Sequence, residues 1–346
     1  MSTIYITEKD ALIKAQHTYL KVFHQQKQKI CIRLSNVSQL IIFDNRNLPS
    51  DIIKTLRSHH ISVLYLTQNG EMIGRLENPF QLKAKYLTYQ RQRRRDKEFK
   101  RATAESIIWS KLHNQHTFLQ NWTHYHANYA TQRALNYLTL LMDNLPTATS
   151  LDELREYSEE ADNIYYFALA SLLNFYNPCS RTTTKRISGL LNLGNQLLHQ
   201  YIYTILITTG LHPNYAILHS NGFHELPLAW DFTEEFRALI VDDLVLNFFR
   251  YHLNSNSNGN GNGKNQSRTL LQHFLQHWEA KLRTFVLHPY AGEVSYRQCI
   301  DLQIREYLAC LLDEVEFYRP LAFKHHPVRS SGVITPQQVP LTLVKR

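Results

Sequence analysis

"SVLYLTQNGEMIGRLENPFQ", residues 62–81, contains the boundary that decides the fold. Its first fifteen residues are two short apolar runs separated by Asn69-Gly70. This pair favours a tight hairpin, because a type I′ turn needs positive φ at both central positions. After the segment "ENPFQ" the pattern changes from short β-branched runs to long stretches with helical periodicity. We therefore predict an α+β chain, with a small N-terminal β-rich domain followed by a larger all-α domain.

Upstream of this hairpin, four more runs have the character of strands: "STIYIT", "YLKVF", "KICIRL" and "QLIIF". Each is rich in β-branched or aromatic residues and ends in polar residues. The segment "PSDIIKTLRSHH" predicts one short helix, with Ser50 or Asp51 as its N-cap. Residues 1–78 thus form the predicted β-rich domain, and residues 79–90 the predicted linker.

Downstream, apolar residues recur with the period of an α-helix, and 91–325 form the predicted helical domain. The segments with this period are 84–120, 124–144, 158–176, 187–210, 231–252, 268–285 and 296–315. The Asn/Gly/Ser-rich stretch 254–267 predicts a disordered insert, because it has too little apolar surface to bury. Residues 326–346 are predicted to be a flexible tail.

The composition of the chain favours a polyanionic partner. Its 346 residues include 38 Lys and Arg against 29 Asp and Glu, a formal charge of +9. Such an excess attracts phosphate polymers or anionic membranes. No run reaches the roughly 18 apolar residues of a membrane span, and the N-terminus lacks the features of a secretory signal. The four cysteines form no C-x-x-C pair, which favours reduced thiols in a cytoplasmic protein over a zinc or redox motif.

The most basic stretch is "KAKYLTYQRQRRRDKEFKR", residues 83–101, where nine Lys or Arg accompany two acids. A solvated helix face is the ordinary explanation of such a run. A net charge of +7 on one helix instead favours nucleic-acid binding through phosphates, without sequence readout. The predicted DNA-binding residues are Arg91, Arg93, Arg94, Arg95, Lys97, Lys100 and Arg101.

A second feature is the stretch "AILHSNGFHELPLAWDFTEEFR", residues 216–237. His219 ends an apolar run, and Asp231 and Glu234 follow at helical spacing. A lone histidine is more often a hydrogen-bonded structural residue, and acids favour the first turn of any helix. The pattern alone leaves both explanations open.

A third acidic segment, "LREYSEEADNIYYFALASLLNF" at 154–175, shifts the balance toward a metal site. Ser158 is predicted to cap this helix and to place Glu159 in its first turn, whereas Glu160 points to another side. Carboxylates and one imidazole form a hard, mostly oxygen donor set that suits Mg²⁺ or Mn²⁺. Beside a basic groove, such an ion implies phosphodiester chemistry.

These motifs, taken together, resemble the CRISPR-associated adaptation endonuclease and integrase family ("Cas-one"). The resemblance covers about residues 1–325, and no single motif is specific, but their order and spacing are. In the family, a glutamate precedes an aromatic pair by seven residues, as Glu159 precedes Tyr166-Phe167. The other matching segments are "KLHNQ" (111–115), "SGLLNLG" (188–194), "GLHPNYAILH" (210–219), "LAWDFTEEFR" (228–237), "YRQCIDLQ" (296–303) and "FYRPLAF" (317–323).

The resemblance implies that Glu159, His219 and Glu234 are the catalytic metal ligands, with Asp231 as an auxiliary ligand for Mg²⁺ or Mn²⁺. Glu160 stands where the family usually has glycine, so the register of this helix can differ by one residue. The resemblance further implies a homodimer formed through the β-rich domain and a hetero-hexamer with a "Cas-two" partner.

The implied activity is metal-dependent insertion of short DNA fragments into a CRISPR array, in which 3′-hydroxyls attack phosphodiesters. The chain has no G-x-x-x-x-G-K-[ST] loop and no evident Ser/His/Asp nucleophile set, in agreement with direct transesterification. Two alternatives remain: a stand-alone Mg²⁺/Mn²⁺ nuclease for branched or single-stranded DNA, and a catalytically degraded DNA-binding scaffold.

Overall fold

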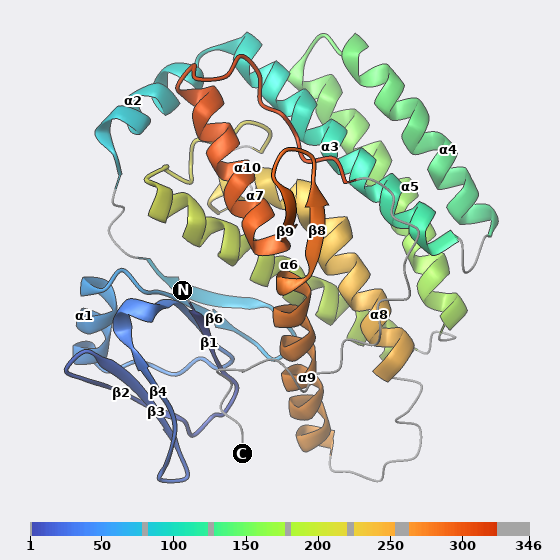
Figure 1. Ribbon diagram of the computed structural model, residues 1–346. Coiled ribbons are helices and arrows are strands. Elements are labelled where there is room, and N and C mark those ends of the chain that lie inside the picture. The colour runs from blue at the N-terminus through green and yellow to red at the C-terminus, as the bar shows by residue number, and fades with distance from the viewer. Residues whose placement is uncertain are drawn as a thin grey trace.

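A computed structural model describes residues 2–77, 82–123, 128–176, 181–219, 225–252 and 263–323 (Figure 1). Strands and one short helix form the N-terminal part, and a larger helical part follows. The predicted α+β class, with its β-rich N-terminal domain, is confirmed. None of the described helices is long and apolar enough to cross a membrane.

The N-terminal part contains two sheets. A mixed sheet has the order β1-β5-β6-β7, in which β1, β5 and β6 are parallel and β7 is antiparallel to β6. The second sheet, β2-β3-β4, is antiparallel and includes a strand, β2, that we did not predict. The elements are β1 (Ser2–Ile6), β2 (Leu12–Gln16), β3 (Tyr19–His24), β4 (Lys27–Arg33), β5 (Val37–Ile42), α1 (Ser50–Ser58), β6 (Ser62–Leu66) and β7 (Met72–Leu76).

The three parallel strands of the mixed sheet are buried on both faces. Because side chains alternate along a strand, one set of residues packs with β2–β4 and α1, and the other packs into the helical core. Ile4, Ile6 and Ile42 belong to the first set, and Tyr5 and Leu64 belong to the second. The β-rich part therefore shares a core with the helices, and residues 84–90 of the predicted linker are themselves helical.

The helical part packs against one side of the mixed sheet and forms most of the molecule (Figure 1). Its elements are α2 (Ala84–Arg93), α3 (Lys97–Thr123), α4 (Tyr129–Asn144), α5 (Leu151–Tyr176), α6 (Arg181–Thr209), α7 (Pro227–Arg237), a π-helical turn (Ala238–Asp242), α8 (Asp243–His252), α9 (Gly263–Arg283), β8 (Phe285–His288), β9 (Gly292–Ser295) and α10 (Tyr296–Leu311). The β8–β9 hairpin is an addition to the all-α domain that we predicted.

Two predicted helix boundaries are wrong. The predicted helix 84–120 is interrupted at Asp96, whose carboxylate accepts the backbone N–H of Phe99 at 3.0 Å and so starts α3. The predicted cap Ser158 lies buried inside α5, which begins at Leu151. Ser150 caps this helix instead, because its hydroxyl accepts the N–H of Glu153 at 3.2 Å.

The predicted disordered insert overlaps a helix. Residues 263–267 belong to α9, whereas the rest of the insert, 254–262, lies outside the described residues. The predicted tail, 326–346, also lies outside them.

The predicted hairpin at Asn69-Gly70 is confirmed as β6–β7, but the predicted turn type is wrong. Gly70 has φ 80°, while Asn69 is not among the residues with positive φ. Thr67 accepts the N–H of Gly70 at 3.0 Å and donates its own N–H to Glu71 at 2.8 Å. This is a three-residue loop with one left-handed residue, which needs glycine only at its last position.

This turn also joins the N-terminal part to α6. A Cβ on Gly70 would lie 2.4 Å from the Cα of Leu193, and Asn192 donates its side-chain amide to the Gly70 carbonyl at 3.0 Å. A Cβ on Gly189 would lie 3.6 Å from the carbonyl oxygen of Asn69, so α6 and the turn approach each other closely here too. The segment "SGLLNLG" thus serves as the docking site of the hairpin turn.

We expect Gly70→Ala to lower the free energy of unfolding by about 2–5 kcal/mol, as judged by urea denaturation. A left-handed conformation costs a non-glycine residue roughly 1–2 kcal/mol, and the forced contact with α6 adds about 1–3 kcal/mol. Gly292→Ala separates these effects, because Gly292 has φ 73° but nothing within 4 Å of its Cβ position. Equal effects at Gly70 and Gly292 would show that the turn does not dock closely.

Candidate active site

Asp231, in the first half of α7, organises the loop that precedes this helix. Its carboxylate is fully buried and accepts the backbone N–H groups of Ile217, Leu218 and His219 at 2.6, 3.2 and 2.9 Å. It also lies 2.8 Å from Nδ1 of the His219 ring. Because a carboxylate only accepts, Nδ1 carries the proton and the lone pair of the neutral ring is on Nε2.

These contacts define what Asp231 does. Both of its oxygens already accept protein hydrogen bonds, so Asp231 positions the His219 ring and backbone. Its predicted role as an auxiliary metal ligand stays a prediction. Burial lowers the pKa of His219, but the hydrogen bond and charge of Asp231 outweigh this effect, and the net shift is upward.

Glu234, one turn further along α7, lies between two cations. Its carboxylate is 3.0 Å from Nζ of Lys111 on α3 and 2.5 Å from Nη2 of Arg237. Burial alone would raise the pKa of this carboxyl, but the charges of Arg237 and Lys111 lower it to about 2. Arg237 also donates to the hydroxyl of Tyr166 on α5 at 2.9 Å. Glu234 is therefore ionised and held from two sides.

Lys111 connects three helices at this point. Its side chain is only 3% exposed, and its ammonium lies 2.7 Å from the Asp162 carboxylate and 2.8 Å from the Ser158 hydroxyl. Both of these residues are on α5. Gln115, one turn along α3, donates to the other Asp162 oxygen at 3.0 Å. Lys111 opens the segment "KLHNQ" that carried part of the resemblance, but we predicted no role for Lys111 or Asp162.

The acids near the start of α5 are on its surface. Glu159 is exposed, and its predicted role as a metal ligand stays a prediction. Glu160 is also exposed and accepts the hydroxyl of Tyr137 on α4 at 3.1 Å. Within the described parts of the chain, no three His, Cys, Asp or Glu side chains are grouped closely enough to hold a metal ion. The structure thus brings together His219, Asp231 and Glu234.

Glu235, beside Glu234, has a structural role. It is fully buried, receives the hydroxyl of Tyr318 and accepts the N–H of Leu321 at 3.2 Å. Burial raises the pKa of this carboxyl to about 7, and the surrounding hydrogen bonds oppose the rise. Glu235 therefore anchors the segment after α10, which includes the quoted "FYRPLAF", against the candidate site.

The basic helix α2 packs on the loop that leads to His219. The side-chain amide of Gln90 donates to the His212 carbonyl at 3.1 Å and accepts the His212 N–H at 2.9 Å. Arg91 donates to the hydroxyl of Tyr215 at 3.2 Å, and the guanidinium of Arg94 lies 5.9 Å from the same ring. The tertiary structure therefore places part of the predicted DNA-binding segment beside the candidate site.

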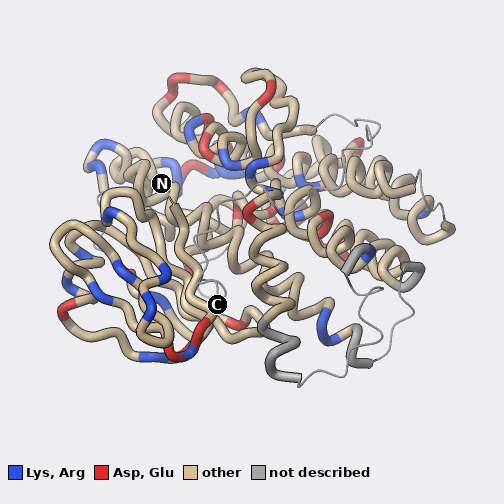
Figure 2. The backbone as a smooth tube through the Cα atoms, turned by 60° about the horizontal axis from the view of Figure 1, so that its bottom comes forward, with Lys and Arg blue, Asp and Glu red and all other residues tan. Residues whose placement is uncertain are grey.

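The predicted DNA-binding residues differ in their surroundings. Arg93 forms ion pairs with Asp96 and Asp313, and Arg101 forms one with Glu105 at 2.9 Å, so both guanidinium groups are already paired within the protein. Burial, followed by the charge of Arg155, lowers the pKa of Lys100. The exposed members are Arg91, Arg94, Arg95 and Lys97. Figure 2 shows that Lys and Arg are also spread over the N-terminal strands, so the basic excess is not confined to this segment.

Arg155 on α5 was not predicted, but it contacts the same loop. Its guanidinium donates twice to the carbonyl of Leu218, at 3.0 and 2.8 Å. It therefore holds the loop from the side opposite to Asp231, which binds the N–H groups.

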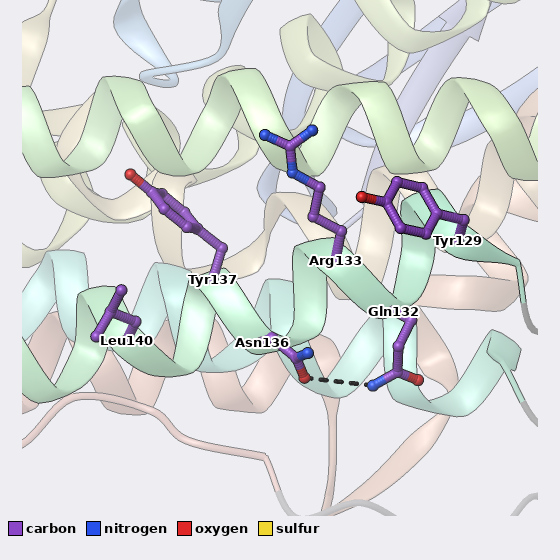
Figure 3. Close-up of a pocket in the computed structure, with 6 residues that line it drawn as sticks. All are labelled: Tyr129, Gln132, Arg133, Asn136, Tyr137 and Leu140. Carbon is purple, nitrogen blue, oxygen red and sulfur yellow. Dashed lines mark hydrogen bonds between the residues drawn. The ribbon is translucent and has the colours of Figure 1, made fainter.

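A hollow of about 340 Å³ lies away from this site, along α4 (Figure 3). Tyr129, Arg133 and Tyr137 project to the same side of the helix, and Gln132 bonds Asn136 at 3.3 Å. None of the predicted site residues lines this hollow.

Comparison with known proteins identifies the family. The sequence pattern of the family described as CRISPR associated protein Cas1 matches residues 4–280. The chain belongs to this family of CRISPR-associated proteins. It is 24% identical over 338 residues to a CRISPR-associated endonuclease Cas1 of Thermus thermophilus, covering 94% of this chain and 98% of that protein. A Cas1 of Thermodesulfovibrio yellowstonii is 26% identical over 257 residues, covering 72% and 80%.

Solved structures show the same fold. A Cas1 protein from Thermotoga maritima superposes with a TM-score of 0.69 at 18% identity, covering 90% of this chain and 97% of that chain. A casposase bound to an integration product gives a TM-score of 0.76 at 18% identity, covering 95% and 96%. The resemblance that we inferred from the motifs is therefore confirmed.

Proposed function

We propose that this protein is a CRISPR adaptation integrase, which joins short DNA fragments to a CRISPR array by 3′-hydroxyl attack on phosphodiesters. The observation that carries the proposal is the convergence of His219, Glu234 and the arginines of α2 in a chain of the Cas1 family. A fold shared with a casposase bound to its integration product supports transesterification over hydrolysis.

The donor chemistry of the site suits Mg²⁺ or Mn²⁺. The Glu234 carboxylate stays ionised, and the ring orientation of His219 presents Nε2, so these two residues would hold the ion. When bound, such an ion polarises a phosphoryl group and stabilises the charge of the transition state. The predicted third ligand, Glu159, stays a prediction.

The other residues orient the site. Asp231 accepts the N–H of His219, and Arg155 donates to the carbonyl of Leu218, so together they fix the backbone of this loop. Arg91 and Arg94 provide positive charge beside that loop, where a DNA backbone would approach.

We further propose a homodimer formed through the N-terminal part and a complex with a small "Cas-two" partner. The edge strand β7 exposes Met72 at 37% and Ile73 at 45%, an apolar edge that pairing with a second copy would cover. A Cas6-RT-Cas1–Cas2 complex has the same fold over 94% of this chain, with a TM-score of 0.73 at 18% identity, although this chain covers only 36% of that protein.

Joining of defined DNA tests the reaction. With the partner protein and Mn²⁺, we expect a short duplex with free 3′-hydroxyls to become covalently joined to a repeat-containing target, as seen on denaturing gels. Fragments with 3′-deoxy ends should bind but not join, because only the nucleophile has been removed. Equal target cutting with both fragments, and no joined product, would favour the stand-alone nuclease. DNA binding without cutting or joining would favour the scaffold.

Salt dependence tests the basic helix. We expect replacement of Arg91, Arg94 and Arg95 by Gln to weaken DNA binding and to flatten the slope of log K against log salt by up to about 0.9 per lost phosphate contact. Arg93→Gln is the matched control for binding, because Arg93 is already paired with Asp96 and Asp313. An unchanged slope in the triple variant would mean that residues 91–95 do not contact DNA.

A further inference from the structure

The charges on the outer face of the β2–β4 sheet are all positive. Residues 12–33 contain five Lys or Arg and no Asp or Glu. Side chains alternate along each strand, so Lys14 and Lys21 point outward beside the buried Ile13 and Val22. The two lysines are directly opposite each other in the β2–β3 register. Like charges in this position destabilise a strand pair, so the stability of the sheet does not explain them.

Neutral groups hold the cations of this face. The ammonium of Lys14 lies 5.6 Å from the centroid of the Phe23 ring, and Lys21 donates to a side-chain amide oxygen at 2.9 Å. On β4, Arg33 donates through Nε to the Tyr19 hydroxyl at 3.2 Å. Within the described part of the chain, none of these three cations forms an ion pair with an acid. Their charge is therefore available to an external anion.

A DNA backbone is the partner whose charge matches this face. Three cations on one sheet face suit a row of phosphates, whereas a second copy of this chain would bring the same positive face and be repelled. The rings of Tyr19 and Phe23 are half-buried and already contact cations. This arrangement favours contacts with phosphates over stacking with bases.

The face lies on the far side of the mixed sheet from the candidate active site. Ile13 and Val22, on the inner side of β2–β4, share a core with Ile42, whereas the adjacent Ile41 packs into the helical core. Figure 1 shows the mixed sheet between β2–β4 and α2. Because packed sheets are about 10 Å apart, DNA that lies along α2 does not reach the outer face of β2–β4. The two basic surfaces would thus contact separate segments of DNA.

We propose that the outer face of β2–β4, with Lys14, Lys21 and Arg33, is a second DNA-binding surface, which contacts a DNA segment other than the one at the candidate active site. The inference rests on the proposed function for the choice of DNA as the partner. Its contacts are with phosphates, so they carry no sequence information.

Binding of a labelled duplex to the full chain tests the inference. A duplex of about 30 base pairs with arbitrary sequence is titrated by fluorescence anisotropy at about 0.05–0.2 M salt, and far-UV circular dichroism checks the fold. We expect joint replacement of Lys14, Lys21 and Arg33 by Gln to weaken binding at least about fivefold. The slope of log K against log salt should flatten by up to about 0.9 per lost phosphate contact. The charge-retaining variant Lys14→Arg/Lys21→Arg/Arg33→Lys should keep the affinity within about twofold.

A matched control removes the same charge elsewhere. Arg133, Lys185 and Arg186 are exposed cations of α4 and α6, and their joint replacement by Gln should change the affinity less than about twofold, because salt screens distant charges. Combining the sheet variant with the α2 triple variant should multiply their separate effects, as expected for distant, independent sites.

Three results would overturn the inference. Unchanged binding and slope in the sheet variant would mean that this face does not contact DNA. Equal weakening in the control variant would show an effect of net charge alone. Binding to anionic phospholipid vesicles that is lost in the sheet variant, with DNA binding retained, would assign the face to a membrane. Joining is measured separately: a protein that binds DNA at this face but joins no fragment would refute the proposed integrase and still support the second surface.

Discussion

His219→Ala is expected to reduce metal-dependent DNA joining by at least about 100-fold while the protein stays folded. A catalytic metal is worth several kcal/mol of transition-state stabilisation, and about 1.36 kcal/mol corresponds to a factor of ten. The His219 side chain is 20% exposed, so its truncation leaves no large internal cavity. Its ring is hydrogen-bonded to Asp231 at the edge of the site and is not part of the hydrophobic core.

His212→Ala is the matched control, measured with the same DNA and Mn²⁺. His212 lies on the same loop, but its backbone makes the contacts with Gln90 on α2. We expect this variant to keep joining activity within a few-fold. Full activity of His219→Ala would remove the metal assignment at this position.

Glu234→Ala is expected to lower the free energy of unfolding at pH 7 by about 3–5 kcal/mol, in urea denaturation. Its loss leaves the buried Arg237 without its carboxylate and Lys111 with Asp162 alone, and breaking such a buried ion pair costs about this much. Glu159→Ala, at an exposed position, should change stability by no more than about 0.5 kcal/mol.

The pH dependence of this effect has a definite sign. The pKa of Glu234 falls from 4.5 to about 2 in the folded protein, so its stabilisation is complete above pH 4.5 and is lost as pH falls toward 2. The stability difference between Glu234→Ala and the unaltered chain should shrink over that range. A constant difference, or a cost below about 1 kcal/mol at pH 7, would mean that the two cations are stabilised by other groups.

Local sequence patterns predicted much of the fold. The β6–β7 hairpin, the β-rich N-terminal domain and the helical remainder follow from turn residues and apolar periodicity, which act over a few neighbours. The turn type and the start of α5 were wrong for a local reason as well. The three-residue loop has a left-handed conformation only at Gly70. At the start of α5, Ser150 rather than Ser158 accepts one of the backbone N–H groups that have no partner within the helix.

The sequence by itself determined the residue types and spacings of the predicted site, which are His219, the acids of α7 and a basic segment. Only the tertiary structure decided which side chains meet. Lys111 and Asp162 are 51 positions apart, and Arg91 and Tyr215 are 124 apart, so no local pattern relates them. Helical spacing predicts which residues share one face of α5, but packing against α3 and α7 decides which of them contact charged side chains. That choice depends on long-range ion pairs, because a buried charge is tolerated only where a partner from another helix reaches it.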